Sequence, residues 1–173
     1  PGVTKAAASR EIKLNVLFAQ RPLNPRILGI TGDYLGVNNL RLARGRFLDS
    51  ADGDICARVA VIGAGVAREL GTDPLGRQLL LGGAPYTVVG LLANREVDLK
   101  GLEASGVADA NFDVLLPLET LQGRTRQLDM RSELDEIQFQ LATEEMLYAA
   151  GTTIRRELTA AHGGVKDFDL VVL

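Results

Sequence analysis

The sequence predicts one compact domain, or two small subdomains, that mix strands with helices. The chain has 173 residues, of which 46% are hydrophobic and 24% charged, as in ordinary soluble globular proteins. Two apolar runs flank Gly82-Gly83, which is typical of a β-hairpin. Near the end of the chain, an alternating segment, a helical stripe and another apolar segment follow one another, which predicts a β-α-β unit.

The first third of the chain predicts short elements. Ile12, Leu14 and Val16 alternate with polar residues, which favours a strand, and a second strand is expected over residues 26–30. One helical turn is expected over residues 33–37.

The middle of the chain predicts a buried strand over residues 58–62 and a short helix over 64–70 that Gly71 ends. A turn at 72–76 then leads into the hairpin, whose strands are expected at 78–81 and 86–92. Residues 94–111 have the composition of a loop, and we expect this long loop to be mobile or functional.

The last third predicts a strand over residues 112–116 that ends at Pro117, and a helical turn over 118–121. Ile137, Phe139 and Leu141 alternate with polar residues, which predicts a half-buried strand. Thr143 is expected to cap a long amphipathic helix that ends at Gly163-Gly164, and residues 168–173 are expected to form a final strand.

Composition excludes several classes of function. The net charge of -3 and the eight aromatic residues argue against nucleic acid as a partner. The longest uncharged run, residues 78–94, is shorter than the ~20 apolar residues that a membrane-spanning helix needs. The chain begins at Pro1, so we expect a fragment or a processed product, soluble in itself even if its parent chain is not.

One motif resembles a dinucleotide-binding turn. Gly63 and Gly65 follow a predicted strand and open a predicted helix, but Arg68 occupies the third small position and no acid follows at the required spacing. A packing turn is the favoured interpretation. A small soluble enzyme that binds a nucleotide at Gly63–Gly65 remains an alternative.

Other reactive side chains also favour structural roles. His162 lies at a predicted helix end, where an imidazolium suits the helix dipole. Asp49, Asp52 and Asp54 miss the calcium-loop pattern and are expected in a solvated acidic loop. Cys56 is expected to be a small apolar filler. Three further carboxylates are expected on a solvated face beside a strand: Glu133, Asp135 and Glu136. No catalytic, cofactor or metal residue is therefore assigned.

The order of several motifs resembles the extracytoplasmic core domain of MacB-like and FtsX-like ABC transporter permeases. These motifs span nearly the whole chain: Gly29–Leu35, Leu42–Phe47, Val59–Gly63, Asp73–Arg77, Tyr86–Gly90, Leu115–Leu118 and His162–Asp169.

The resemblance implies an α+β fold with two parts. A porter-like β-α-β subdomain would be built from both chain ends, residues 1–36 and 112–173. A second, mixed α/β subdomain, residues 37–111, would be inserted into it. Eight residues of the shared motifs are expected to have structural roles: Gly45, Arg46, Gly63, Asp73, Pro74, Gly76, Gly90 and Pro117.

The resemblance also implies that this chain itself catalyses no reaction. The domain would lie on the periplasmic or extracellular face of the inner membrane, in a membrane-embedded and dimeric transporter. It would transmit ATP-driven movement and dock substrate, or partners such as a periplasmic adaptor protein. The phosphate-binding motif G-x-x-x-x-G-K-[ST] is absent from the sequence, so the ATPase is expected in another domain or subunit. A freestanding ligand-binding protein is the other alternative.

Overall fold

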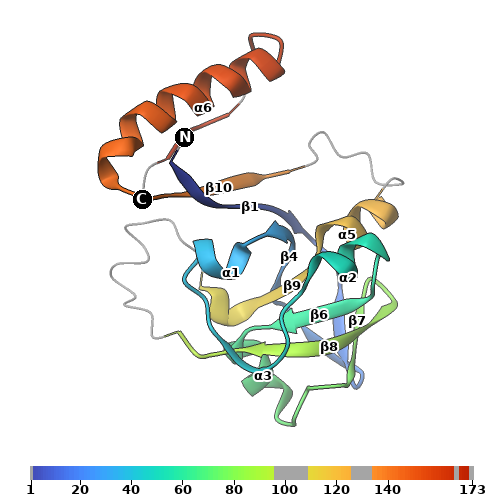
Figure 1. Ribbon diagram of the computed structural model, residues 1–173. Helices are drawn as coiled ribbons and strands as arrows, with labels where there is room; N and C mark the ends of the chain where they lie inside the picture. Colours follow the sequence, from blue (N-terminus) through green and yellow to red (C-terminus); the bar gives the residue numbers. More distant parts are fainter. Residues whose placement is uncertain (1, 96–108, 126–133, 166–167, 172–173) are drawn as a thin grey trace.

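The computed structural model describes residues 2–95, 109–125, 134–165 and 168–171 (Figure 1). The strands are β1 (Val3–Ile12), β2 (Val16–Phe18), β3 (Arg21–Leu23), β4 (Arg26–Gly32), β5 (Leu42–Gly45), β6 (Val59–Ile62), β7 (Gln78–Leu81), β8 (Ala84–Leu92), β9 (Asp113–Pro117) and β10 (Glu136–Leu141). The helices are α1 (Tyr34–Val37), α2 (Ser50–Asp54), α3 (Ala64–Leu70), α5 (Leu118–Thr125) and α6 (Leu147–Ala161), with 3₁₀ turns η1 (Ala110–Phe112) and η2 (Glu144–Met146).

The strands form one mixed sheet in the order β10-β1-β4-β9-β6-β8-β7-β2-β3, with β5 paired to β8. The pairs β4–β9 and β6–β8 are parallel, and the other pairs are antiparallel. Strand β9, from the second half of the chain, lies between β4 and β6 and so joins the two ends of the sheet. The sheet runs without a break across the expected boundaries at residues 37 and 111, and the division into two subdomains stays a prediction.

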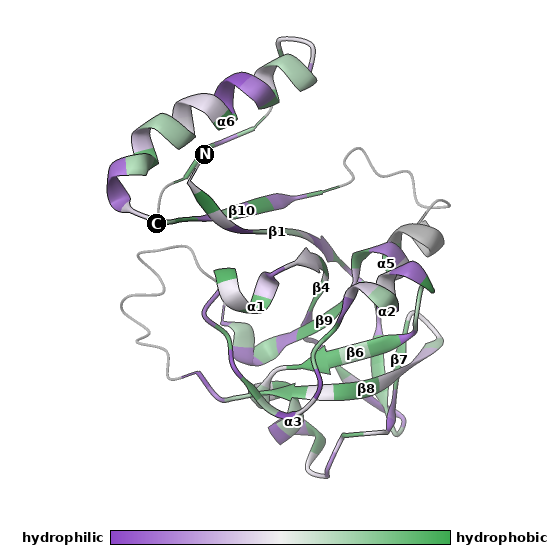
Figure 2. Cartoon of the chain, viewed as in Figure 1, coloured by the Kyte–Doolittle hydropathy of each residue, from purple (hydrophilic) through white to green (hydrophobic). Residues whose placement is uncertain are grey.

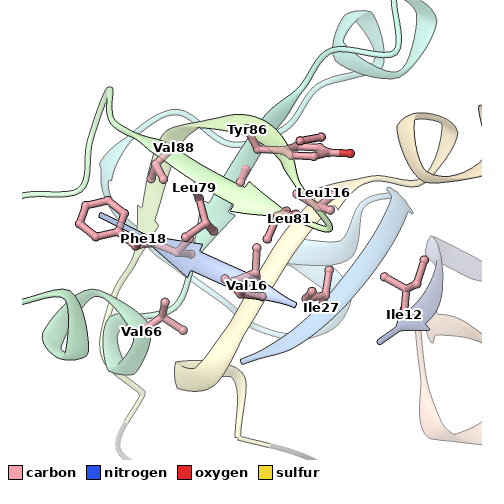
Figure 3. Close-up of a cluster of buried hydrophobic side chains, with 14 of the residues drawn as sticks. Ile12, Val16, Phe18, Ile27, Val66, Leu79, Leu81, Tyr86, Val88 and Leu116 are labelled. Carbon is pink, nitrogen blue, oxygen red and sulfur yellow. The ribbon is translucent and has the colours of Figure 1, made fainter. Parts of the chain in front are cut away.

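The main core lies between the sheet and α3, which contributes Val66 and Leu70. Side chains from β2, β7 and β8 converge there, and Figure 3 shows Phe18, Leu79 and Val88 pointing toward one another above Val66 of α3. A second cluster packs α1 and the segment around Phe47 against the other side of the sheet. Strands β6 and β8 are hydrophobic along most of their length (Figure 2), as expected for strands buried on both faces.

The predicted hairpin and helix end are confirmed. Gly82 and Gly83 connect β7 to β8 with φ of 54° and 81°, the left-handed conformation that a two-residue hairpin turn requires. Gly71 ends α3 with φ of 66°, a conformation that glycine adopts without steric cost.

The predicted closing β-α-β unit is only partly correct. Strand β10 and helix α6 form, but the described residues 168–171 form no strand. Instead this segment lies along α6: Leu170 is beside Gly151, and the Phe168 ring meets His162 edge-on at 5.9 Å.

The burial predicted for β10 is wrong. Ile137 and Phe139 are 43% and 39% exposed, because α6 makes few contacts with this edge strand. Helix α6 begins at Leu147, after η2, and Thr143 makes no side-chain cap.

The long loop expected over residues 94–111 falls largely outside the described residues, since 96–108 are not described. Its two ends are joined. The Asn111 side chain accepts a hydrogen bond from the Arg95 backbone N–H at 2.9 Å and donates one to the Arg95 carbonyl at 2.8 Å.

Candidate functional site

The Gly63–Gly65 turn is filled by the protein's own backbone. Gly63 precedes α3, and its N–H donates to the Asp113 carbonyl at 2.8 Å. A Cβ on Gly63 would collide with the carbonyls of Ala110 and Asn111, and one on Gly65 would lie 2.8 Å from the Asn111 oxygen. The space beside these glycines therefore accommodates η1, which supports the packing interpretation over a nucleotide site.

Three of the family-motif residues meet where β5 crosses β8. Gly45 and Gly90 are register partners, and the Arg46 N–H donates to the Val89 carbonyl at 2.9 Å. Gly45 has φ of 78°, and a Cβ there would meet the Val89 carbonyl; a Cβ on Gly90 would meet the Arg46 carbonyl. The two backbones can approach this closely only with glycine at both positions.

Arg46 also clamps α2. Its two terminal nitrogens donate to the two Asp52 carboxylate oxygens at 2.6 and 2.8 Å, a bidentate pair. Asp49 and Asp52 form a reciprocal capping box at the helix start. The Arg46 hydrogen bonds and the Asp49 backbone N–H lower the pKa of Asp52, although burial opposes the shift.

The prediction that Asp49, Asp52 and Asp54 occupy a solvated loop is wrong in its secondary structure, because they belong to a capped helix. Asp49 and Asp54 are exposed as expected, but the Asp52 side chain is only 7% exposed. The cause is the guanidinium of Arg46, which provides the partner that a buried carboxylate needs. The spacing of Asp49 and Asp52, which is that of a capping box, could have indicated the helix.

The Asp73–Gly76 turn tethers β5 to the start of β7. Asp73 accepts hydrogen bonds from Arg44 at 2.9 Å and from the Leu75 N–H at 3.2 Å. Pro74 is buried, and Gly76 has φ of 74°. At the centre of the sheet, Pro117 ends β9 and is the register partner of Ile30.

A buried ion pair that the sequence did not indicate joins β4 to β9. Arg26 donates to both carboxylate oxygens of Asp113 at 2.9 and 2.7 Å, and the two are register partners. Burial raises the pKa of Asp113, whose side chain is 1% exposed, and the bonds from Arg26 oppose that shift. Burial, together with the Asp113 charge, also raises the pKa of Tyr34 to about 12.

The remaining candidates do not converge. His162 follows α6 and packs on Phe168. Cys56 was expected to be a small apolar filler, and this is wrong: it is exposed just after α2, with φ of 49°. Asp135 accepts a hydrogen bond from the Glu11 N–H, Glu136 lies exposed on β10, and Glu133 falls outside the described residues.

Among the described residues, no three His, Cys, Asp or Glu side chains are grouped as a metal would require. Within the same ranges, no helix is both long enough and apolar enough to cross a membrane. The motif residues therefore connect neighbouring strands and helices, and their hydrogen bonds are made with the protein's own backbone and side chains.

Comparison with known proteins decides the family. Residues 1–157 match the model of the MacB-like periplasmic core domain. The chain belongs to this family. It is therefore the periplasmic domain of a MacB-like ABC transporter permease, and the expected periplasmic location and α+β fold are confirmed.

Its curated relatives are much longer proteins. The chain is 29% identical to the macrolide export ATP-binding/permease protein MacB of Vibrio parahaemolyticus over 126 residues, covering 72% of this chain and 18% of that protein. It is 26% identical to the pyoverdine export ATP-binding/permease protein PvdT of Pseudomonas aeruginosa over 172 residues, covering 98% and 25%. The chain thus spans about a fifth to a quarter of the length of these relatives.

Solved structures share the fold. The periplasmic region of MacB from Actinobacillus actinomycetemcomitans superposes with a TM-score of 0.74 at 17% identity, covering 94% of this chain and 69% of that one. The extracellular domain of the noncanonical transporter YknZ from Gram-positive bacteria gives 0.73 at 20% identity, covering 94% and 78%.

Proposed function

We propose that this domain transmits ATP-driven conformational change from the membrane to partners in the periplasm. ATP hydrolysis occurs in another domain or subunit, and the domain contributes shape and stiffness. The transporter works as a dimer, engages a periplasmic adaptor protein and docks partner or substrate for export. The relatives named as ATP-binding/permease export proteins support this assignment.

The observation that carries the proposal is the path of the sheet. Both described ends of the chain lie at one pole, where the Gly2 carbonyl accepts a hydrogen bond from the Ala142 N–H and Leu170 packs beside Gly151 of α6 (Figure 1). From that pole one hydrogen-bonded sheet runs from β10 to β3 at the opposite pole. A displacement applied at the terminal pole is therefore carried through main-chain hydrogen bonds to the far pole.

The joints along this path are stiff. At the centre of the sheet, the bidentate Arg26–Asp113 pair ties β4 to β9. Farther along, the Arg46–Asp52 pair fixes α2 beside the β5–β8 crossing. Bidentate pairs constrain both distance and angle, so these joints resist bending between neighbouring elements.

Distances between the two copies of the domain in the parent transporter test the proposal. A spin label at Gln78, an exposed residue of β7, is introduced after Cys56 is replaced by serine. The distance between the two Gln78 labels is expected to differ between the ATP-bound and ADP-bound transporter. Identical distance distributions in both states would contradict transmission of movement by this domain.

A further inference from the structure

Strand β10 (Glu136–Leu141) ends the sheet on one side, and one of its two edges is open. It pairs with β1, and among the described strands none pairs with its other edge. Along such an edge, every second residue directs its backbone N–H and C=O groups away from the sheet. These groups can form hydrogen bonds with a strand from another chain.

The sequence of β10 does not protect this edge from pairing. Sheets avoid pairing with other chains through short edge strands, prolines and lysines. Strand β3, at the other end of the sheet, has three residues, and Pro22 in its middle supplies no N–H. Strand β10 has six residues, contains neither Pro nor Lys, and carries one charge, at Glu136. The two ends of the sheet therefore differ, and only the β10 end is suited to accept a further strand.

The two faces of β10 have different chemistry. Gln138 lies on the face toward α1, where its side-chain oxygen accepts a hydrogen bond from the Asn38 amide at 2.7 Å. Side chains alternate between the faces of a strand, so Ile137 and Phe139 lie on the opposite face. They are 43% and 39% exposed. A strand added at the open edge would bury part of this apolar pair as well as satisfy the backbone groups.

We infer that this edge binds β10 of a second copy of the domain, antiparallel and centred on Gln138, so that the two sheets become continuous. In this register Ile137 lies opposite Phe139 of the second copy, and a β-branched residue opposite an aromatic one is a favourable cross-strand pair. Glu136 lies opposite Gln140 of the second copy, whose amide N–H groups can donate to the carboxylate. A two-fold interface uses the same residues on both copies, so each of these pairs occurs twice.

The complementarity of β10 with itself favours a second copy over an unrelated strand. In the proposed register the two Glu136 residues are four positions apart along the strands, about 14 Å, so like charges do not face one another. Centring the pair on Phe139 instead would place Glu136 opposite Ala142, whose side chain has no donor.

The contact is small, so it needs copies that are already held close together. A pair of six-residue strands buries little surface, but tethering two copies in one assembly gives a high effective concentration. This step rests on the proposed function, in which the transporter is a dimer. The β10 contact is therefore expected in the parent transporter rather than between isolated domains at low concentration.

Disulfide cross-linking tests the inference in a parent transporter from which other cysteines, including Cys56, have been removed. Gln138→Cys is expected to join the two copies on oxidation, because opposite residues of paired strands have Cα atoms ~4.5–5.5 Å apart, within reach of a disulfide. Glu136→Cys, at an exposed residue of the same strand, is the matched control and is expected to form no cross-link. Combining Glu136→Cys with Gln140→Cys is expected to restore cross-linking, because these two positions are opposite.

Two results would overturn the inference. One is the absence of a Gln138→Cys cross-link in both the ATP-bound and the ADP-bound transporter. Pairing of the edge with another segment of the same chain, or with a different protein, would give this result. The other is cross-linking of Glu136→Cys alone as strongly as Gln138→Cys, which would indicate random collision or a different register.

A charge placed on the edge gives a second, independent test. Ile137→Lys, added to the Gln138→Cys transporter, puts a lysine opposite Phe139 of the second copy and is expected to remove most of the cross-link. Ile55→Lys, at a residue that is 76% exposed just after α2, is the control and is expected to leave it unchanged. The thermal midpoint serves as the folding control and is expected to be unchanged in both variants. Undiminished cross-linking with Ile137→Lys would overturn the inference.

Failure of this inference can be told apart from failure of the proposed function. If Gln138→Cys forms no cross-link but the distance between the two Gln78 labels still responds to ATP, transmission stands and the β10 contact does not. If the cross-link forms but the Gln78 distances are identical in both nucleotide states, the β10 contact stands and transmission does not.

Discussion

Removing the cation from the buried Arg26–Asp113 pair is expected to destabilise the domain severely. Arg26→Met keeps much of the side-chain volume but leaves the Asp113 carboxylate, whose side chain is 1% exposed, without its two charge-assisted hydrogen bonds. Because the pair connects parallel strands β4 and β9, these two hydrogen bonds are lost at the centre of the sheet.

The magnitude follows from burial. Leaving one partner of a fully buried pair uncompensated costs about 3–5 kcal/mol. The Arg26 side chain is 31% exposed, so water can reach part of the site and we expect a loss of about 2–3 kcal/mol. For a chain of this size, that corresponds to a fall in the thermal midpoint of roughly 5–10 °C.

The pH dependence has a definite sign. Burial already raises the pKa of Asp113 in the intact domain, and loss of Arg26 removes the interaction that opposes this shift. A carboxyl group with a raised folded-state pKa costs stability above that pKa, and the cost disappears as the pH falls through it. The deficit of Arg26→Met relative to the wild type is therefore expected to shrink between pH 7 and about pH 4.

Urea unfolding at pH 7 and pH 5 measures both effects. Arg41→Met, a change at an exposed arginine, is the matched control and is expected to shift the free energy of unfolding by less than about 0.5 kcal/mol. The double variant with Asp113→Leu is expected to recover most of the loss. A loss below about 1 kcal/mol for Arg26→Met, or an equal loss at both pH values, would refute the reasoning.

Three further predictions concern the joints and turns. Gly90→Ala is expected to cost about 2 kcal/mol or more in urea unfolding, because its Cβ meets the Arg46 carbonyl, whereas Gly83→Ala has open space and costs only the ~1 kcal/mol of its positive φ. Equal losses at the two glycines would contradict the close-approach argument. Gln20→Gly, at φ of 66°, is expected to raise the free energy of unfolding by roughly 0.5 kcal/mol; a lower thermal midpoint would speak against strain in that turn. The pKa of Asp52 is lowered in the folded domain, so its contribution to the free energy of unfolding is present above pH ~4 and is lost as the pH falls further. Asp52→Asn should therefore make the free energy of unfolding depend less on pH below pH ~4. A pH dependence parallel to that of the wild type would count against the Arg46–Asp52 pair.

Local patterns predicted the elements whose structure depends on local chemistry. The hairpin at Gly82-Gly83 and the end of α3 at Gly71 follow from glycine's access to positive φ. Strand β9 and the turn at Asp73–Gly76 were likewise indicated by proline and aspartate at turn positions. Burial of β10 could not be predicted, because alternation identifies a strand but not what covers its apolar face.

The motif residues could be located from sequence, but most of their partners could not. Arg46 was expected to be structural, yet its pairing with Asp52 depends on where the β5–β8 crossing places the two segments. The Arg26–Asp113 pair joins residues 87 positions apart, brought together only by the parallel register of β4 and β9.

The claim that the domain transmits movement as a rigid body is tested most directly by the distance between two labels within one copy of the domain. Spin labels at Glu136 of β10 and Gln78 of β7, both exposed, lie in strands on either side of the central strand β9. In the parent transporter this distance is expected to stay the same, with one narrow distribution, in the ATP-bound and ADP-bound states. A shifted or broadened distribution on nucleotide exchange would mean that the sheet bends, and would contradict transmission by a stiff body.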